Sequence, residues 1–182
     1  MSVETDPDQF VRVLVGCGSK KRSTASKAKD LYTSRYFKWK RRFAEIYGDD
    51  WHITSAEHGL LDPDTVIEPY DKSLTNMDPA ARRAWGSDTS EELQGLEWEH
   101  VDVVILLMGQ LYIEPIEPTL ETFPVTIGYP FDHTSGNVEQ EQWLEKRVTE
   151  AKTAAPDETV SLNLDPIQEA AHNQQTLTEF ET

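Results

Sequence analysis

Short apolar runs rich in β-branched residues alternate along this chain with amphipathic segments, and this alternation restricts the fold more than any other feature. The runs that read as buried strands cover residues 11–16, 51–56, 101–108 and 124–129. Helical spacing or helix-start signals mark residues 31–47, a segment opened by Asp78-Pro79, residues 112–122 and residues 138–152. Apolar strands that alternate with helices are typical of parallel sheets covered on both sides. We therefore expect an α/β fold, with a mostly parallel open sheet of about four strands and helices on both faces.

The expected organisation of the 182 residues is one folded domain between a short leader and an acidic tail. The α/β domain is assigned to residues 10–152, and residues 1–9 are expected to form a disordered leader. Residues 153–182 carry six acidic residues, no lysine or arginine and few large apolar side chains. Such a segment buries too little surface to offset its chain entropy, so we expect a mostly disordered tail.

The sequence argues against membrane-spanning, exported and metal-cluster proteins. The longest apolar run, residues 103–108, is too short to cross a bilayer, and the amino-terminal residues lack the basic and apolar regions of a signal peptide. We therefore expect a cytoplasmic protein that makes no contact with a membrane. A single cysteine excludes an internal disulfide and a cysteine-cluster metal site, and no histidine spacing supports another metal. No metal and no cofactor are expected.

The charge of the chain is strongly acidic overall and basic in one segment. There are 33 acidic and 17 basic residues, a formal net charge of −16, which is typical of a halophilic protein from a salt-rich cytoplasm. Eleven of the basic residues lie between Arg12 and Arg42. This segment indicates either a local anionic ligand or a solvated helix face, and the sequence leaves both open.

The loop after the first strand, with the sequence GCGSKK, carries the clearest functional signal. In open α/β sheets, ligands bind at the carboxyl ends of the strands, where this loop lies. Its glycines free backbone N–H groups, and Ser19, Lys20 and Lys21 add donors and positive charge, so we expect it to bind an anion such as phosphate. It is neither a Walker A loop nor a complete GxGxxG motif, so ATP and NAD have no specific support. The alternative is an ordinary strand-to-loop turn.

The same edge of the sheet supplies four candidate catalytic side chains, Cys17, Ser19, His58 and Asp71. Cys17 or Ser19 is the candidate nucleophile, and nearby lysines would activate the thiol of Cys17. His58 or Asp71 would handle protons, and we expect His58 to approach Cys17 across neighbouring strand ends. The alternatives are a packed strand-end cysteine, a turn histidine and a turn-capping aspartate.

A weaker pair of candidates, Asp132 and His133, follows the last predicted strand. Ser19, His58 and Asp132 can be drawn as a catalytic triad, but no nucleophile elbow accompanies them. The structural alternative, a loop aspartate and histidine without a catalytic role, is slightly favoured.

Aromatic and basic side chains are interleaved at the start of the first predicted helix. Such a mixture can stack bases and hold phosphates, or it can be an amphipathic helix with an aromatic core face. Together with the glycine loop it gives the predicted phosphate- or nucleic-acid-binding residues: Gly18, Lys20, Lys21, Tyr32, Ser34 and Arg35.

Several short motifs resemble those of a family of small α/β domains of unknown function, which occur in phages, plasmids, bacteria and archaea. The motifs are CGSKK at 17–21, AKDLYTS at 28–34 with Phe37, SAEHGLL at 55–61, and Pro63-Asp64 through Pro69-Tyr70-Asp71. The resemblance covers residues 11–150 and implies no settled activity. The first motif is also similar to the Pro-Cys…Lys-Pro-Tyr-Ser core of archaeosine synthase, a base-modifying enzyme, although Gly16 precedes the cysteine here. This second resemblance implies a nucleobase or nucleotide substrate.

The acidic tail contains a segment, residues 174–180, that is similar to the box by which replication proteins bind the sliding clamp, PCNA. In that box Gln174 would fill a side pocket, and Leu177 and Phe180 would enter an apolar groove from one helical turn. Glu181 stands where the box has its second aromatic residue, which implies weaker binding.

These features together predict a protein of DNA metabolism, from a halophilic archaeon or its virus, that acts on a nucleotide or nucleic acid and is recruited to the sliding clamp. If it is an enzyme, it is a hydrolase or transferase acting on a nucleobase, a nucleotide or a nucleic acid. The alternative is a non-catalytic DNA-binding accessory module of repair or replication.

Overall fold

A five-stranded sheet forms the centre of the protein, and the computed structural model describes residues 4–6, 8–132, 134–153 and 162–163. The strand order is β5-β4-β2-β7-β8. Four of the strands run parallel: β2 (Val11–Gly16), β4 (Asp50–Ser55), β7 (Val103–Leu107) and β8 (Thr126–Gly128). The fifth, β5 (Gly59–Leu61), pairs antiparallel with β4 at one edge. The predicted α/β fold with a mostly parallel sheet is confirmed.

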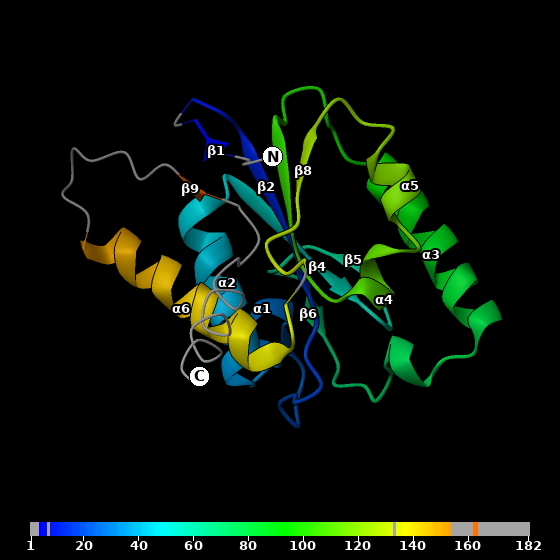
Figure 1. Cartoon of the computed structure of the whole chain (residues 1–182). Helices are drawn as coiled ribbons and strands as arrows, with labels where there is room; N and C mark the ends of the chain where they lie inside the picture. Colours follow the sequence, from blue (N-terminus) through cyan, green and yellow to red (C-terminus); the bar gives the residue numbers. More distant parts are fainter. Residues whose placement is uncertain (1–3, 7, 133, 154–161, 164–182) are drawn as a thin grey trace, which may run out of the picture.

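Helices cover both faces of this sheet (Figure 1). One face carries α1 (Ala28–Leu31), α2 (Arg35–Tyr47) and α6 (Asn137–Thr153). The other carries α3 (Pro79–Gln94), α4 (Gln110–Ile113) and α5 (Glu117–Leu120). Within the described residues, no helix is both long enough and apolar enough to cross a membrane.

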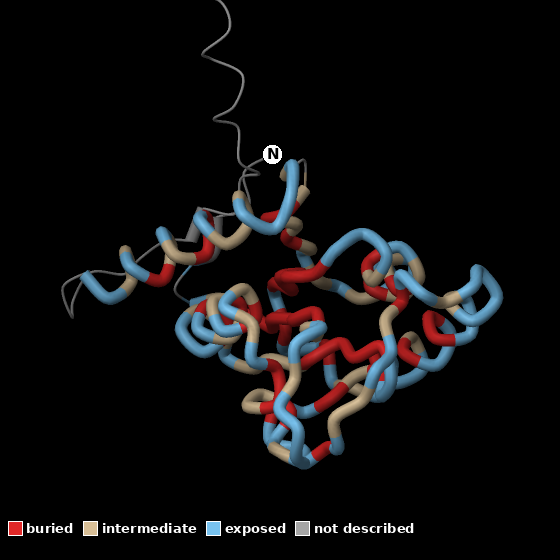
Figure 2. The backbone as a smooth tube through the Cα atoms, turned by 90° about the horizontal axis from the view of Figure 1, so that it is seen from below, coloured by how far each residue is buried: buried red, intermediate tan, exposed pale blue. Residues whose placement is uncertain are grey.

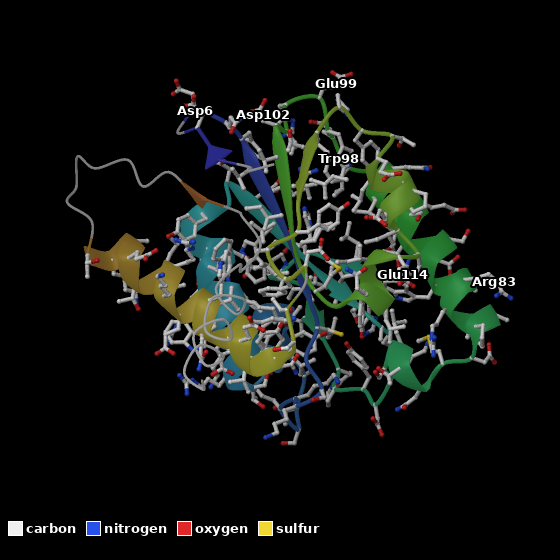
Figure 3. The ribbon with its side chains drawn as sticks, viewed as in Figure 1. Asp6, Arg83, Trp98, Glu99, Asp102 and Glu114 are labelled. Atoms are coloured by element: carbon white, nitrogen blue, oxygen red, sulfur yellow. The ribbon has the colours of Figure 1, made fainter. Side chains whose placement is uncertain are left out.

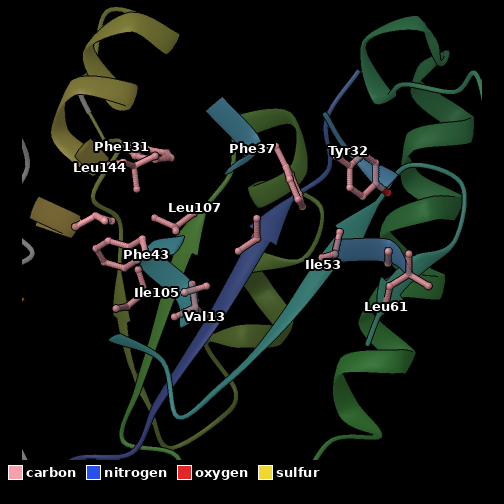
Figure 4. Packing of buried hydrophobic residues seen from close by; sticks show 14 of the residues in the cluster. Val13, Tyr32, Phe37, Phe43, Ile53, Leu61, Ile105, Leu107, Phe131 and Leu144 are labelled. Atoms are coloured by element: carbon pink, nitrogen blue, oxygen red, sulfur yellow. The ribbon is translucent and has the colours of Figure 1, made fainter. Parts of the chain in front are cut away.

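Alternation along the strands divides the buried side chains into two cores. Val13 and Val15 of β2 pack beneath α2 and α6, whereas Leu14 packs on the opposite face beneath α3 and α4. Figure 4 shows Val13 in the first core, with Phe43 from α2 nearby. Figure 2 shows buried positions gathered in the central strands and exposed positions along the outer turns of the helices. All six residues of β2 are buried, as expected for the central strand of the sheet.

The path of the chain reverses direction across the sheet at the carboxyl ends of β2 and β7. From β2 the chain passes through α1 and α2 to β4 on one side of β2, and it returns through α3 to β7 on the other side. The loops that leave β2 and β7 therefore diverge to opposite faces of the sheet. Such a topological switch point is where open α/β sheets bind their ligands.

The predicted helix over residues 31–47 begins only at Arg35 in the structure, because α1 ends at Leu31 and the chain is extended at Tyr32 before Ser34 caps α2. Tyr32 has φ −82° and ψ 122°, and its backbone forms an isolated antiparallel bridge with Lys21. The Ser34 side chain caps α2 by accepting a hydrogen bond from the Phe37 N–H at 3.2 Å. Apolar spacing continues across this break, so periodicity alone could not locate it.

Two other segments also differ from the sequence prediction. Residues 57–73, expected as a loop, contain β5 and β6 (Val66–Ile67), and β6 pairs with β3 (Ser26–Lys27). They are followed by a 3-10 helix, η1 (Leu74–Asn76). The predicted helix over 112–122 is divided into α4 and α5, because Pro115 has no N–H with which to continue the hydrogen bonding of α4, and Pro118 lies at the start of α5.

The first and last described segments lie side by side. β1 (Glu4–Thr5) pairs antiparallel with β9 (Leu162–Asn163), and both strands belong to segments that were expected to lack regular structure. Near them, at the start of the sheet, Asp102 accepts a hydrogen bond from the Phe10 N–H at 2.8 Å. Figure 3 shows Asp102 and Glu99 at this end, with Trp98 lying closer to the centre of the molecule. The segment that the sequence predicts to bind the sliding clamp, residues 174–180, lies outside the described residues.

Candidate active site

Cys17 lies directly after β2 and reaches both neighbouring strand ends. Its backbone N–H donates to the Thr54 carbonyl of β4 at 3.0 Å. Its Sγ lies 3.4 Å from the hydroxyl of Tyr112, on α4 after β7, and the two groups share a hydrogen bond. The half-buried thiol therefore lies at the switch point, where the loops after β2 and β7 diverge.

Lys40, on α2, is the charged residue that approaches Cys17 from the covering helix. It is 2% exposed, and its ammonium donates to the Gly16 carbonyl at 2.6 Å, one residue before Cys17. Burial lowers the pKa of Lys40 to about 8, and the nearby Cys17 opposes that shift. Lys40 therefore changes its charge close to neutral pH, and it does so beside the thiol of Cys17.

A chain of hydroxyl groups borders the thiol on the side of β4. The Tyr32 and Tyr70 hydroxyls share a hydrogen bond of 2.8 Å, and the Tyr70 hydroxyl shares another of 2.9 Å with Ser55 Oγ. Burial raises the pKa of Tyr32 to about 12. Burial and the neighbouring Cys17 raise the pKa values of Tyr70 and Tyr112 well above their usual range. These phenols stay protonated at neutral pH and can donate hydrogen bonds to an anion or to a ligand.

His58 is exposed at the turn between β4 and β5. Its backbone N–H donates to Ser55 Oγ at 3.1 Å, and its ring meets the ring of Tyr70 edge-on, with centroids 5.5 Å apart. Tyr70 thus neighbours both His58 and Cys17. The expected approach of His58 to Cys17 stays a prediction, and the contact that the structure shows for the His58 ring is with Tyr70.

The two lysines of the glycine loop differ in their environments. The ammonium of Lys21 lies 4.1 Å from the Tyr70 ring centroid, and it donates to the Ser19 carbonyl at 3.4 Å. Ser19 and Lys20 have exposed side chains. A Cβ at Gly18 would meet the Tyr32 Cβ at 3.4 Å, so the loop packs closely on the segment that precedes α2. The predicted anion site at this loop stays a prediction.

Two arginines of α2 form ion pairs with carboxylates of the same chain. Arg35 pairs with Glu141 at 2.8 Å and with Glu145 at 3.0 Å, both on α6. Arg41 pairs with Asp30 at 2.7 Å and with Glu45 at 2.7 Å. These contacts favour the interpretation of α2 as an amphipathic helix over that of a surface that grips a nucleic-acid backbone.

No contact with the thiol is seen for the remaining candidates among the described residues, and one candidate lies outside those residues. Asp71 is exposed, and its carboxylate makes no hydrogen bond or ion pair with any described residue, whereas Tyr70 beside it enters the site. Asp132 lines a separate hollow of about 160 Å³ beyond the ends of β7 and β8. His133 is outside the described residues. Within the described part of the chain, no three histidine, cysteine or carboxylate side chains gather as a metal site.

Sequence reasoning missed three members of the site, Lys40, Tyr70 and Tyr112. Lys40 lies three residues from Phe37 and from Phe43, both buried, and this spacing was a signal that it faces the core. Tyr70 was visible as the central residue of the Pro-Tyr-Asp motif, but the aspartate was selected. For Tyr112 the loop after β7 was identified, but no feature of the sequence singled out the phenol.

Two comparisons with known proteins bear on this site. Uncharacterized protein YfjM of Bacillus subtilis (strain 168) is 26% identical over 106 residues, which are 54% of this chain and 69% of that protein. A family model described as a family of unknown function (DUF6884) matches residues 13–146. The match includes the residues around the thiol and excludes the acidic tail. The chain therefore belongs to the DUF6884 family of unknown function.

Proposed function

We propose that this protein is an enzyme, a hydrolase or transferase, that acts on a nucleobase or nucleotide and uses Cys17 as its nucleophile. The observation that carries the proposal is the placement of this thiol at the switch point of the sheet, hydrogen-bonded to Tyr112 and close to buried Lys40. Charged groups with perturbed pKa values cluster at catalytic sites, because burial adjusts them for proton transfer.

The surrounding groups suit a reaction that passes through a thiolate. Lys40, with a pKa of about 8, can hold positive charge beside the sulfur as the thiol loses its proton. The protonated phenol of Tyr112 can donate a hydrogen bond to the same sulfur. The hydroxyls of Tyr32 and Tyr70 are further donors for a developing negative charge on a substrate.

A nucleotide fits the remaining side chains at this edge. Ser19, Lys20 and Lys21 supply donors and positive charge for a phosphate next to the thiol. The half-buried ring of Tyr70, already approached by the Lys21 ammonium, offers a surface for a base, whereas the ring of Tyr32 is buried in the core. The similarity of the cysteine motif to that of a base-modifying enzyme supports the same substrate class.

The setting of this activity is also part of the proposal. The clamp-binding segment would recruit the enzyme to PCNA through Gln174, Leu177 and Phe180, and so place it in DNA metabolism. The net charge of −16 supports a salt-rich cytoplasm of a halophilic host, in which only close contacts hold a nucleotide. A non-catalytic DNA-binding module is less well supported, because Arg35 and Arg41 are paired with carboxylates.

Nucleotide binding at the glycine loop is tested by calorimetry with nucleoside monophosphates. Replacing Lys20 and Lys21 together by Ala should weaken binding about tenfold or more, which corresponds to about 1.4 kcal/mol. Lys20 is exposed, and Lys21 would lose its contact with the Tyr70 ring, so the free energy of unfolding should fall by about 1 kcal/mol and the fold should persist. Arg83→Ala is the control, because this side chain projects outward from α3 (Figure 3). Equal affinities in the wild type and the double variant would remove the phosphate site.

Recruitment is tested with a peptide of residues 170–182 and the purified sliding clamp. The wild-type peptide should bind, and a peptide with Leu177→Ala and Phe180→Ala should not, because the two apolar anchors would be lost. Affinity should hold or rise with added salt, since the peptide and an acidic clamp repel one another at low ionic strength. Equal calorimetric signals from the two peptides would contradict the role of this segment.

A further inference from the structure

A second cavity lies beside the candidate active site, between α3 and the turn that joins β4 to β5. Its volume is about 360 Å³, which is within the range of small-molecule sites. Trp85, Thr89 and Asp88 line it from α3, and Glu57 and His58 line it from the turn. None of the functions proposed above uses this cavity.

The lining of the cavity is negatively charged. Glu57 is paired with Lys72 at 3.3 Å, and Glu92 accepts a hydrogen bond from the Leu60 N–H at 2.6 Å. Asp88 forms no hydrogen bond or ion pair with the described residues, so its carboxylate is available to a ligand. The lining thus contains one ammonium group, that of Lys72, and three carboxylates, those of Glu57, Asp88 and Glu92. This excess of negative charge favours a positively charged ligand.

Thr89 gives an independent sign that a ligand belongs here. The residue is fully buried and lines the cavity, and its hydroxyl finds no hydrogen-bond partner among the described residues. A threonine inside a helix ordinarily bonds back to the carbonyl four residues earlier when no other partner exists. An unsatisfied buried hydroxyl costs about 1–3 kcal/mol, and a ligand that bonds to it would recover part of that cost.

Trp85 supplies a rigid aromatic wall. Its indole N–H donates to the Ser55 carbonyl at 2.9 Å, and its ring meets that of Tyr112 edge-on at 5.5 Å. The ring is therefore held in place by the strand end that carries Ser55. Aromatic faces attract organic cations, and Trp attracts them most strongly.

We propose that this cavity binds a small organic cation, a guanidinium or primary amine on a short apolar chain. Asp88 and Glu92 balance its charge, Thr89 provides a hydrogen bond, and Trp85 packs against it. Gly59 supports the arrangement: its φ is +68°, and a Cβ there would collide with the Glu92 carboxylate. The site stands independently of the chemistry assigned to Cys17.

The test is calorimetry of the full chain with agmatine, which carries both a guanidinium and an amine, in 0.5 M salt to screen surface charge. Saturable binding of one agmatine is expected, weakened about tenfold by Asp88→Asn, since one charge contact of about 1.4 kcal/mol is lost. Thr89→Val should also weaken binding, and Thr89→Ser should preserve it.

Glu91→Gln is the matched control, because it removes one negative charge from an exposed position of α3 that does not line the cavity. It should leave agmatine affinity unchanged, and so should Cys17→Ser. Absence of saturable binding, or equal losses in Asp88→Asn and Glu91→Gln, would overturn the inference. Neither result would affect the nucleotide test, so the two proposals fail separately.

Discussion

At the scale of single residues, Lys40 is a lysine whose charged form is destabilised by burial and which lies beside the candidate nucleophile, Cys17. Its ammonium lies in the apolar layer between α2 and the sheet, with the Gly16 carbonyl as its hydrogen-bond acceptor and the ring of Tyr36 at 4.6 Å. The native state therefore disfavours the charged form, and the pKa falls from 10.5 to about 8. A shift of that size corresponds to on the order of 3 kcal/mol at pH 7. Such costs are retained where a group serves function.

The first residue-scale prediction concerns the pH dependence of stability. Between the native pKa near 8 and the unfolded value of 10.5, the unfolded state holds more protons than the native state, so stability should rise with pH. Relative to Lys40→Met, the wild type should gain about 2 kcal/mol in its free energy of unfolding from pH 7 to pH 9.5. Urea denaturation of both proteins at the two pH values measures this difference. A pH-independent difference would contradict the assigned environment of Lys40.

At the scale of elements, the start of α2 determines how the site is assembled. Because the chain is extended at Tyr32 before Ser34 caps the helix, Tyr32 can bond to Tyr70 while α2 carries Lys40 beneath the thiol. An uninterrupted helix over residues 31–47, as the apolar spacing predicts, would turn the Tyr32 ring differently. Ser34 is a possible helix cap in the sequence, but Leu31 and Phe37 on either side of it continue the apolar spacing of a single helix. The spacing therefore gave no reason to begin the helix at Ser34.

The second prediction tests this cap. Ser34→Ala should lower the free energy of unfolding by about 1 kcal/mol, because the Phe37 N–H would lose its side-chain acceptor. Ser23→Ala, in the exposed part of the preceding loop, should have almost no effect. Chemical denaturation of the two variants provides the comparison. Similar stabilities would mean that the side chain of Ser34 does not hold the start of α2.

At the scale of the whole molecule, the sequence predicted the sheet better than it predicted the site. The four parallel strands were visible because each lies in a short segment rich in β-branched and other apolar residues. β5 was missed because it is three residues long and depends on pairing with β4. The strand-end loops identified Cys17, but the approach of Lys40, Tyr70 and Tyr112 results from packing between distant segments, which local patterns do not encode.

The distribution of charge also became interpretable only in the folded chain. The sequence left open whether the basic segment binds an anion or is a solvated helix face. In the structure, acidic residues more than 100 positions later, on α6, pair with Arg35. In the glycine loop, Lys20 is exposed and Lys21 is half-buried, and neither forms an ion pair with a described residue, so a small anionic ligand such as a nucleotide is favoured over a long nucleic acid.

The account depends most on Cys17 being a reactive thiol in a nucleotide site, and alkylation of this single cysteine with iodoacetamide tests it directly. Labelling followed by mass spectrometry should be slowed by saturating nucleoside monophosphate, because the ligand would cover the sulfur. It should also be about tenfold slower in Lys40→Met at pH 7, where the positive charge beside the thiol is lost, and unchanged in Lys38→Met, an exposed lysine on the same helix. Labelling rates that are identical with and without nucleotide, and identical in Lys40→Met, would contradict the assignment of the region around Cys17 as an active site.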